Sequence, residues 1–114
     1  MAIQNVIGGG EGAFLSATGI TAAGTTQATA TVLTAQDNEV TTVASGTGVS
    51  LSPFLSAGEE LTVFNVGANP LKVYPFLGTQ INALPVNTAM LLSPNTGVMF
   101  RGVSTTRVFG VLSA

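Results

Sequence analysis

The sequence contains no cysteine, no histidine and no tryptophan. Histidine is the commonest general base in enzymes and cysteine the commonest thiol nucleophile, so both kinds of catalysis lack their usual group. A Ser-His-Asp triad is impossible, and so is a zinc site built from imidazole or thiolate ligands. We therefore predict that the chain is not an enzyme and holds no metal ion or cofactor.

Charge is scarce as well. Only 7% of the 114 residues are charged, five of them acidic and three basic, which gives a net charge of −2. Soluble domains typically carry about 25% charged residues. Three basic residues are too few to neutralise several phosphates, so we expect no binding to nucleic acid. A surface so poor in charge indicates that another protein surface, from a sister subunit or a larger assembly, covers part of it.

Long hydrophobic runs are missing too. The longest candidate, residues 88–92, falls far short of the roughly 20 apolar residues that span a bilayer. Residues 1–7 lack the basic and long apolar regions of a secretory signal peptide. We therefore expect no membrane partner and synthesis in a cytoplasm.

What the chain does contain is typical of β-structure. Short segments rich in Val, Thr and Phe alternate with turns formed by 14 glycines and 5 prolines, and no window shows helical spacing of apolar residues. These segments predict an all-β protein. The predicted strands cover residues 29–34, 38–44, 48–51, 60–65, 71–74, 80–81, 89–92, 96–103 and 107–112.

The turns between these strands have clear signals. Residues 65–70 (NVGANP) supply Asn and Gly for positive φ and then a proline, which predicts an antiparallel hairpin between residues 60–65 and 71–74. Residues 93–97 (SPNTG) predict a similar turn, and residues 104–106 (STT) a tight link between the last two strands. This spacing favours an antiparallel β-sandwich or a small barrel, and the sequence leaves open which of the two.

Residues 1–26 differ from the rest, and we divide the chain into an N-terminal arm or loosely structured segment (1–26) and a β domain (27–114). The arm contains a glycine-rich joint at residues 8–12 and then small residues of low information. A frayed terminus is one interpretation. The other is an arm that orders against a neighbouring subunit, because its apolar side chains would otherwise stay in water. These candidate contact residues are Ile3, Val6, Ile7, Phe14 and Leu15.

Several predicted strands carry apolar side chains on both faces. Leu61 and Val63 alternate with Phe64 and Val66, and the same pattern recurs at residues 71–76 and 108–112. An antiparallel sheet with one face in water should instead alternate apolar with polar residues. The pattern therefore predicts that both faces are covered, one of them by a contact between subunits.

The few groups that could carry chemistry favour structural roles. Glu59 and Glu60 are adjacent, and in a strand their side chains would point to opposite faces. Residues 37–39 (DNE) offer oxygen ligands but lack the further acidic positions and the glycine of a calcium loop, so a polar turn is favoured. The glycines of residues 8–12 lack the Lys-Ser/Thr that follows a phosphate-binding loop.

Arg101 and Arg107 flank the last predicted turn and could face each other on paired strands. Because like charges would repel there, we expect at least one to reach a carboxylate, either in this chain or in another subunit. We include Arg101, Arg107 and Phe76 among the candidate interface residues. Five aromatic residues could form a platform for a sugar, but phenylalanine is mostly a core residue and we expect them in the core. They are Phe64, Tyr74, Phe76, Phe100 and Phe109.

Residues 60–75 (ELTVFNVGANPLKVYP), with Gly78, Ile81-Asn82 and the closing segment 100–103 (FRGV), resemble small virion proteins of tailed bacteriophages. The similarity covers roughly residues 25–112 and is one of style and spacing. Such proteins resemble capsid decoration, or cement, proteins. The resemblance implies a jelly-roll-like or β-tulip-like fold with an N-terminal arm. It also implies a homo-oligomer, most commonly a trimer, seated on the major capsid protein.

The resemblance thus leads us to expect a virion structural protein on the capsid surface, assembled in the host cytoplasm, that stabilises the phage head mechanically. Phage fibre domains share the same Gly/Thr/Ala-rich β style. A fibre or adhesin domain that binds a host-surface glycan is therefore the alternative.

Overall fold

The structure is a computed structural model, and it describes residues 15–52 and 57–113. These residues form ten strands and one short 3-10 helix, η1 (Gln27–Thr29). The strands are β1 (Ser16–Thr21), β2 (Thr31–Val32), β3 (Asp37–Thr42), β4 (Gly48–Ser50), β5 (Glu60–Asn65), β6 (Leu71–Tyr74), β7 (Gln80–Ile81), β8 (Met90–Leu92), β9 (Thr96–Gly102) and β10 (Arg107–Leu112). The prediction of an all-β protein is confirmed, and every predicted strand overlaps one of β2–β10. Among the described residues, no helix is long and apolar enough to cross a bilayer.

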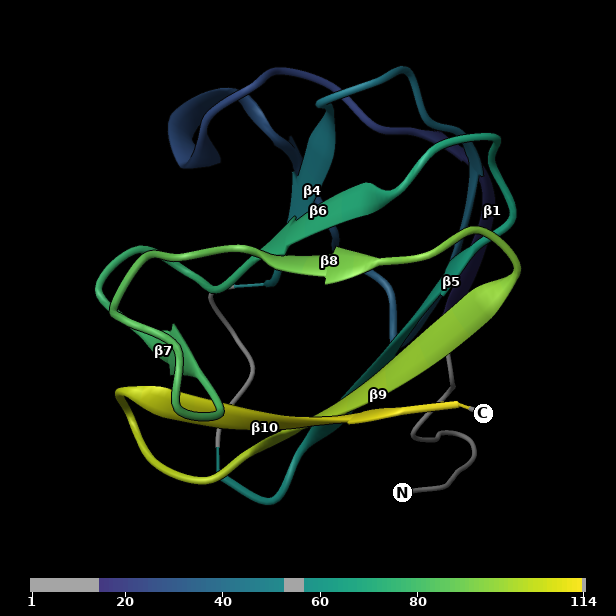
Figure 1. The fold of residues 1–114 in the computed structure, drawn as a ribbon. Helices are drawn as coiled ribbons and strands as arrows, with labels where there is room; N and C mark the ends of the chain where they lie inside the picture. The colour runs from purple at the N-terminus through teal and green to yellow at the C-terminus, as the bar shows by residue number, and fades with distance from the viewer. Residues whose placement is uncertain (1–14, 53–56, 114) are drawn as a thin grey trace.

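The strands form two sheets. The large sheet has the order β1-β3-β5-β9-β10-β7, and the small sheet the order β2-β4-β6-β8. From β1 to β6, each strand lies in the opposite sheet from the strand before it. Within each sheet the successive strands pair in parallel, so this part of the chain winds like a β-solenoid. Figure 1 shows β4, β6 and β8 side by side, with β5, β9 and β10 forming the other wall.

The C-terminal part reverses this direction. β8 pairs antiparallel with β6, and β9 pairs antiparallel with β5. β10 then returns antiparallel beside β9, across the turn that residues 104–106 predicted. The edge strand β7 pairs with β10 in parallel. The predicted antiparallel pairing is therefore wrong for β1–β6 and for this edge pair, and it is correct where β8, β9 and β10 pair with β6, β5 and β9.

The hairpin predicted between residues 60–65 and 71–74 does not form, because β5 and β6 lie in different sheets. Asn65 stabilises this crossing between the sheets. Its side chain is fully buried, and its Nδ2 donates hydrogen bonds to the carbonyl oxygens of Asn69 and Leu92, both at 2.9 Å. Its Oδ1 accepts from the Gly67 amide at 2.9 Å. These bonds hold the turn across the end of the core rather than in the plane of one sheet.

The predicted arm overlaps the β domain. Residues 16–21 form β1, which pairs with β3, and the Ala22 amide donates to the Thr42 carbonyl at 2.9 Å. The described part of the predicted arm is thus bound to the sheet of its own chain. This strand was not predicted from the sequence because the segment is of low complexity. Its hydrogen bonds go to residues about twenty positions further along the chain. The rest of the arm, residues 1–14, lies outside the described residues.

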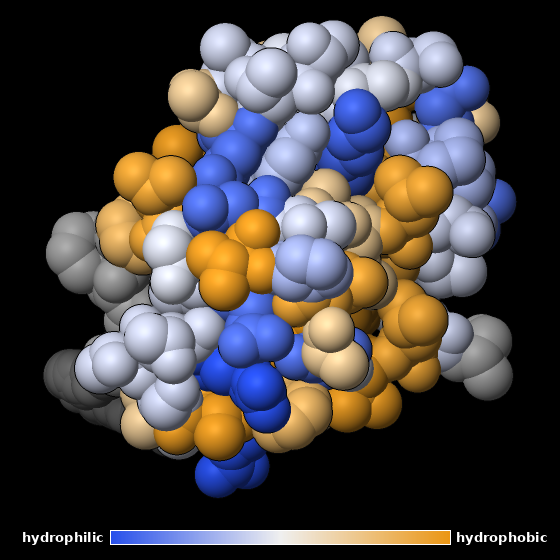
Figure 2. Space-filling view, turned by 60° about the vertical axis from the view of Figure 1, so that its left-hand side comes forward, coloured by the Kyte–Doolittle hydropathy of each residue, from blue (hydrophilic) through white to orange (hydrophobic). Residues whose placement is uncertain are grey.

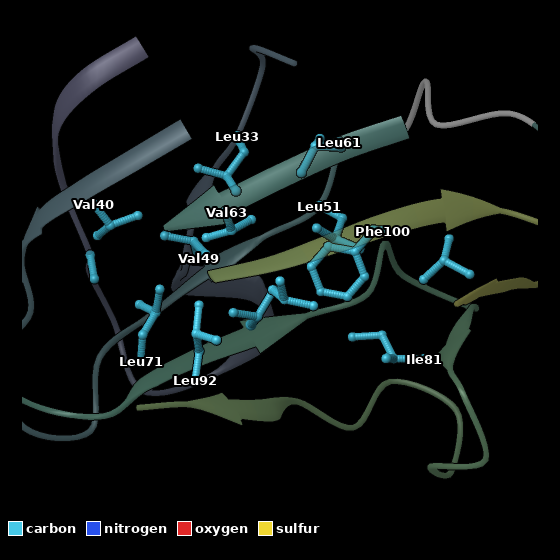
Figure 3. Packing of buried hydrophobic residues seen from close by; sticks show 14 of the residues in the cluster. Leu33, Val40, Val49, Leu51, Leu61, Val63, Leu71, Ile81, Leu92 and Phe100 are labelled. Atoms are coloured by element: carbon cyan, nitrogen blue, oxygen red, sulfur yellow. The ribbon is translucent and has the colours of Figure 1, made fainter. Parts of the chain in front are cut away.

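The core fills the space between the two sheets. Inward-facing side chains of both sheets meet there, among them Leu61 and Val63 of β5, Leu71 and Val73 of β6, and Phe100 of β9. Figure 3 shows the Phe100 ring among aliphatic side chains from several strands. Burying one Val, Leu or Phe side chain contributes about 1.5–3 kcal/mol, so this cluster is the main source of stability.

Candidate interaction surface

The outer face of the large sheet keeps large apolar side chains in contact with water. On β5, Leu61 and Val63 point into the core, while Phe64 points outward. On β9 and β10, Met99, Phe109 and Val111 likewise point outward. The exposed fractions are 45% for Phe64, 42% for Met99, 46% for Phe109 and 64% for Val111. The predicted apolar alternation on both faces is confirmed for β5. On β10 it holds for residues 108–111, but Leu112, predicted on the same side as buried Val108, is exposed at the end of the strand.

The strand register places these four residues beside one another. Met99 of β9 lies directly opposite Val111 of β10. Phe64 is the diagonal neighbour of Met99, because Met99 pairs with Thr62, two residues before Phe64. Phe109 lies two residues before Val111, on the same face of β10. Directly opposed side chains are about 5 Å apart and diagonal ones about 7–8 Å, so the four form one surface, which we call the outer apolar patch.

A glycine beneath Phe64 shapes the patch. Gly97 of β9 pairs with Phe64, and a Cβ placed on Gly97 would lie 2.7 Å from Cδ1 of the Phe64 ring. The ring therefore occupies the space above Gly97 where a side chain would otherwise lie. This contact positions Phe64 at one end of the patch.

The few charges of the chain surround the patch in an ordered way. Asp37 and Glu39 project from the outer face of β3, and Glu60 from β5. Arg101 of β9 and Arg107 of β10 project from the same outer face, on the side of the patch away from β3. These five are most of the eight charged residues in the chain. We call the β3–β5 side the acidic half of the face and the β9–β10 side the basic half.

The outer face of the small sheet is different, because the chain covers part of it. Tyr74 of β6 is 8% exposed, and its hydroxyl donates to the Thr25 carbonyl at 3.1 Å. Gln27 of η1 donates to the Pro75 carbonyl at 2.8 Å. A Cβ on Gly48 of β4 would lie 3.0 Å from the Tyr74 ring, so an aromatic ring covers a glycine here too. Leu91 of β8 remains exposed on this sheet.

The predicted interface residues have varied outcomes. Ile3, Val6, Ile7 and Phe14 lie outside the described residues. Leu15 and Phe76 are both exposed, but neither lies in the outer apolar patch. The Leu15 carbonyl accepts hydrogen bonds from the Gln36 and Asp37 amides, which ties it to the start of β3.

Arg101 and Arg107 border the patch but do not face each other. Arg101 pairs across the strands with Phe109, and its Nη1 lies 3.7 Å from Oε2 of Glu60 on the neighbouring strand. The expectation that one arginine reaches a carboxylate is confirmed, within this chain. Arg107 donates a hydrogen bond to Oε1 of Gln80 at 3.4 Å. Both partners are exposed, so these contacts contribute about 0–1 kcal/mol.

The possible calcium ligands at residues 37–39 point to opposite faces of β3 and do not converge. Asn38 is buried, and its Nδ2 donates to the Ala35 carbonyl at 2.9 Å, whereas Asp37 and Glu39 point outward. The Glu39 carboxylate accepts a hydrogen bond from the Thr18 hydroxyl on β1. In the described part of the chain, no three acidic side chains gather where they could hold a metal ion.

Among the aromatic residues, Phe100 and Tyr74 are buried as predicted, and Phe64, Phe76 and Phe109 are not. The sequence carried a signal for Phe64 and Phe109: each stands opposite in phase to the buried residues of its strand. The signal for Met99 was weaker, since one methionine between Val98 and Phe100 does not show which neighbour faces inward.

Comparisons of the chain with protein-family models, with curated proteins and with solved structures find no match.

Proposed function

We propose that this chain is a non-enzymatic structural protein of a phage virion, and most specifically a capsid decoration protein. In this role it acts as a homo-oligomer, a trimer in the simplest case, seated on the major capsid protein at the capsid surface. Its action is mechanical, because contacts repeated over many copies reinforce a shell collectively even when each is weak.

The observation that carries the proposal is the outer apolar patch, in a protein with very few charges. Proteins that work as monomers rarely expose a contiguous apolar patch unless it serves a function. Aromatic residues, methionine and arginine are also the types that concentrate at protein interfaces, and all three occur here. A sheet whose inner face already encloses a full core leaves this outer face available for another protein.

Purified phage particles test the proposal directly. We expect quantitative mass spectrometry of particles to find the chain in a fixed ratio to the major capsid protein. Immunogold labelling should place it on the head. Absence from washed particles would overturn the virion role.

Labelling on the tail or a fibre would instead support the alternative of a glycan-binding fibre or adhesin domain. The exposed rings of Phe64 and Phe109 are the feature that favours this alternative. A glycan array with the purified chain separates the two, since a decoration protein needs no glycan. Specific glycan binding that is lost in Phe109→Ala would contradict the decoration role.

A further inference from the structure

The outer apolar patch, with an acidic half on one side and a basic half on the other, is suited to a particular partner. We propose that a second copy of this chain docks face to face on the patch, so that the acidic half of each copy meets the basic half of the other. This inference deepens the proposed function and rests on its homo-oligomeric part.

The face, rather than a strand edge, is the contact surface, because the edges are interrupted or short. β1 is one edge of the large sheet, and its pairing with β3 shifts register on both sides of Ile20. Gly19 within it has a φ of 71°, which turns the strand locally. The other edge, β7, has two residues. Bulged and short edge strands are the usual protection against pairing with another sheet.

The composition of the patch favours a protein partner over a polar ligand. The four patch residues have no side-chain hydrogen-bonding group apart from the weakly accepting thioether of Met99. Two of the four are aromatic, and Arg101 stands beside Phe109 in the register. Rings and arginine at the centre of a patch are typical of the residues that carry binding energy between proteins.

The charge order identifies the partner as another copy. A fitting surface needs an apolar centre with acidic groups opposite Arg101 and Arg107, and basic groups opposite Asp37 and Glu39. The register places Asp37 and Glu39 diagonally across the face from Arg101 and Arg107. The face itself has the required pattern when it is turned half a revolution about an axis in the plane of the sheet and perpendicular to the line that joins these acidic and basic groups. Complementary charges of this kind select the orientation and disfavour other partners.

A matched pair of substitutions tests which face is used. Val111 lies in the patch and Leu91 on the outer face of the small sheet, and both are 64% exposed, so an aspartate at either position should fold normally. We expect sedimentation of the full chain to show an oligomer that Val111→Asp weakens at least about thirty-fold. Leu91→Asp should leave it intact. Circular dichroism and thermal melting check that both variants are folded.

A second pair of variants tests the charge order. In Asp37→Lys/Glu39→Lys both halves become basic, and in Arg101→Glu/Arg107→Glu both become acidic. Each variant alone should remain monomeric, because like charges then meet across the interface. An equimolar mixture should recover the complex, which separates a contact between copies from a loss of folding.

The results distinguish the failure of this inference from that of the proposed function. An oligomer dissociated by Leu91→Asp but not by Val111→Asp would place the interface elsewhere and overturn the inference, while a homo-oligomeric role would stand. A wild-type chain that stays monomeric at hundreds of micromolar would contradict both this inference and the homo-oligomeric role in the proposed function. A mixture of charge variants that fails to associate would overturn the acid-to-base order.

Discussion

The outer faces of the two sheets share one local feature but differ in whether the chain covers it. In each, an aromatic ring lies over a glycine of a neighbouring strand: Tyr74 over Gly48 in the small sheet and Phe64 over Gly97 in the large one. Tyr74 is then covered by the segment around Thr25, whereas Phe64 remains 45% exposed. The comparison teaches that this chain can cover an outer ring with its own residues, and that it does so on one sheet and not on the other.

The largest expected difference comes from removing the two rings. Tyr74→Ala should lower the free energy of unfolding by about 3–5 kcal/mol, because it leaves a cavity under a covered surface. Phe64→Ala should cost about 1 kcal/mol in the isolated chain, since water already reaches the ring. Urea unfolding measures both.

Protein concentration needs control in this experiment, because association stabilises the folded state by mass action. The measurements belong at concentrations where sedimentation shows a monomer. Equal losses for the two variants would mean that the outer faces are equally covered and would break the comparison.

Adding a methyl group under each ring should give a smaller difference. In Gly48→Ala the new Cβ would lie 2.8 Å from the backbone oxygen of Lys72, so the pairing of β4 with β6 must shift. We expect a loss of about 1–3 kcal/mol. In Gly97→Ala the new Cβ meets the Phe64 ring, which can move into solvent, and the loss should stay below about 1 kcal/mol. Thermal unfolding compares the two, and a larger loss at Gly97 would contradict this ranking.

Exchanging the two ring types should have the smallest effect. Tyr74→Phe removes the hydrogen bond to the Thr25 carbonyl and should cost about 1 kcal/mol. Phe64→Tyr, the matched control, adds a hydroxyl that water can reach and should change stability by less than about 0.5 kcal/mol. Hydrogen exchange of the amides around residues 22–26 gives a second readout, which should rise in Tyr74→Phe only. No change there would mean that the hydroxyl does not hold the covering segment.

The strand positions could be predicted from the sequence because they depend on local signals. β-branched and aromatic residues mark the strands, and Asn, Gly and Pro mark the turns. β1 was missed because its sequence, SATGIT, has one large apolar residue and a central glycine. β1 forms a strand because it pairs with β3, and the sequence of β1 alone contains no signal for this pairing.

The alternation of successive strands between the two sheets could also not be predicted from local sequence signals. The residues at 65–70 predict a reversal of direction, and a reversal can return along the same sheet or cross to the opposite one. Here the chain crosses, as it does at every connection from β1 to β6, and the side-chain amide of Asn65 stabilises the crossing by donating to the Leu92 carbonyl, 27 residues away. A buried asparagine of this kind resembles any turn asparagine in the sequence.

The sequence by itself determined that the chain is all-β, and which side chains share a face of each strand, because strand alternation has a fixed period of two. It also determined the scarcity of charge. Only the tertiary structure decided which faces are enclosed. Covering Tyr74 requires Thr25, the patch requires Met99 beside Val111, and the acidic and basic halves require β3 and β10 in one sheet. Each of these depends on pairing between residues far apart in the chain, and alternation within a strand carries no information about its neighbours.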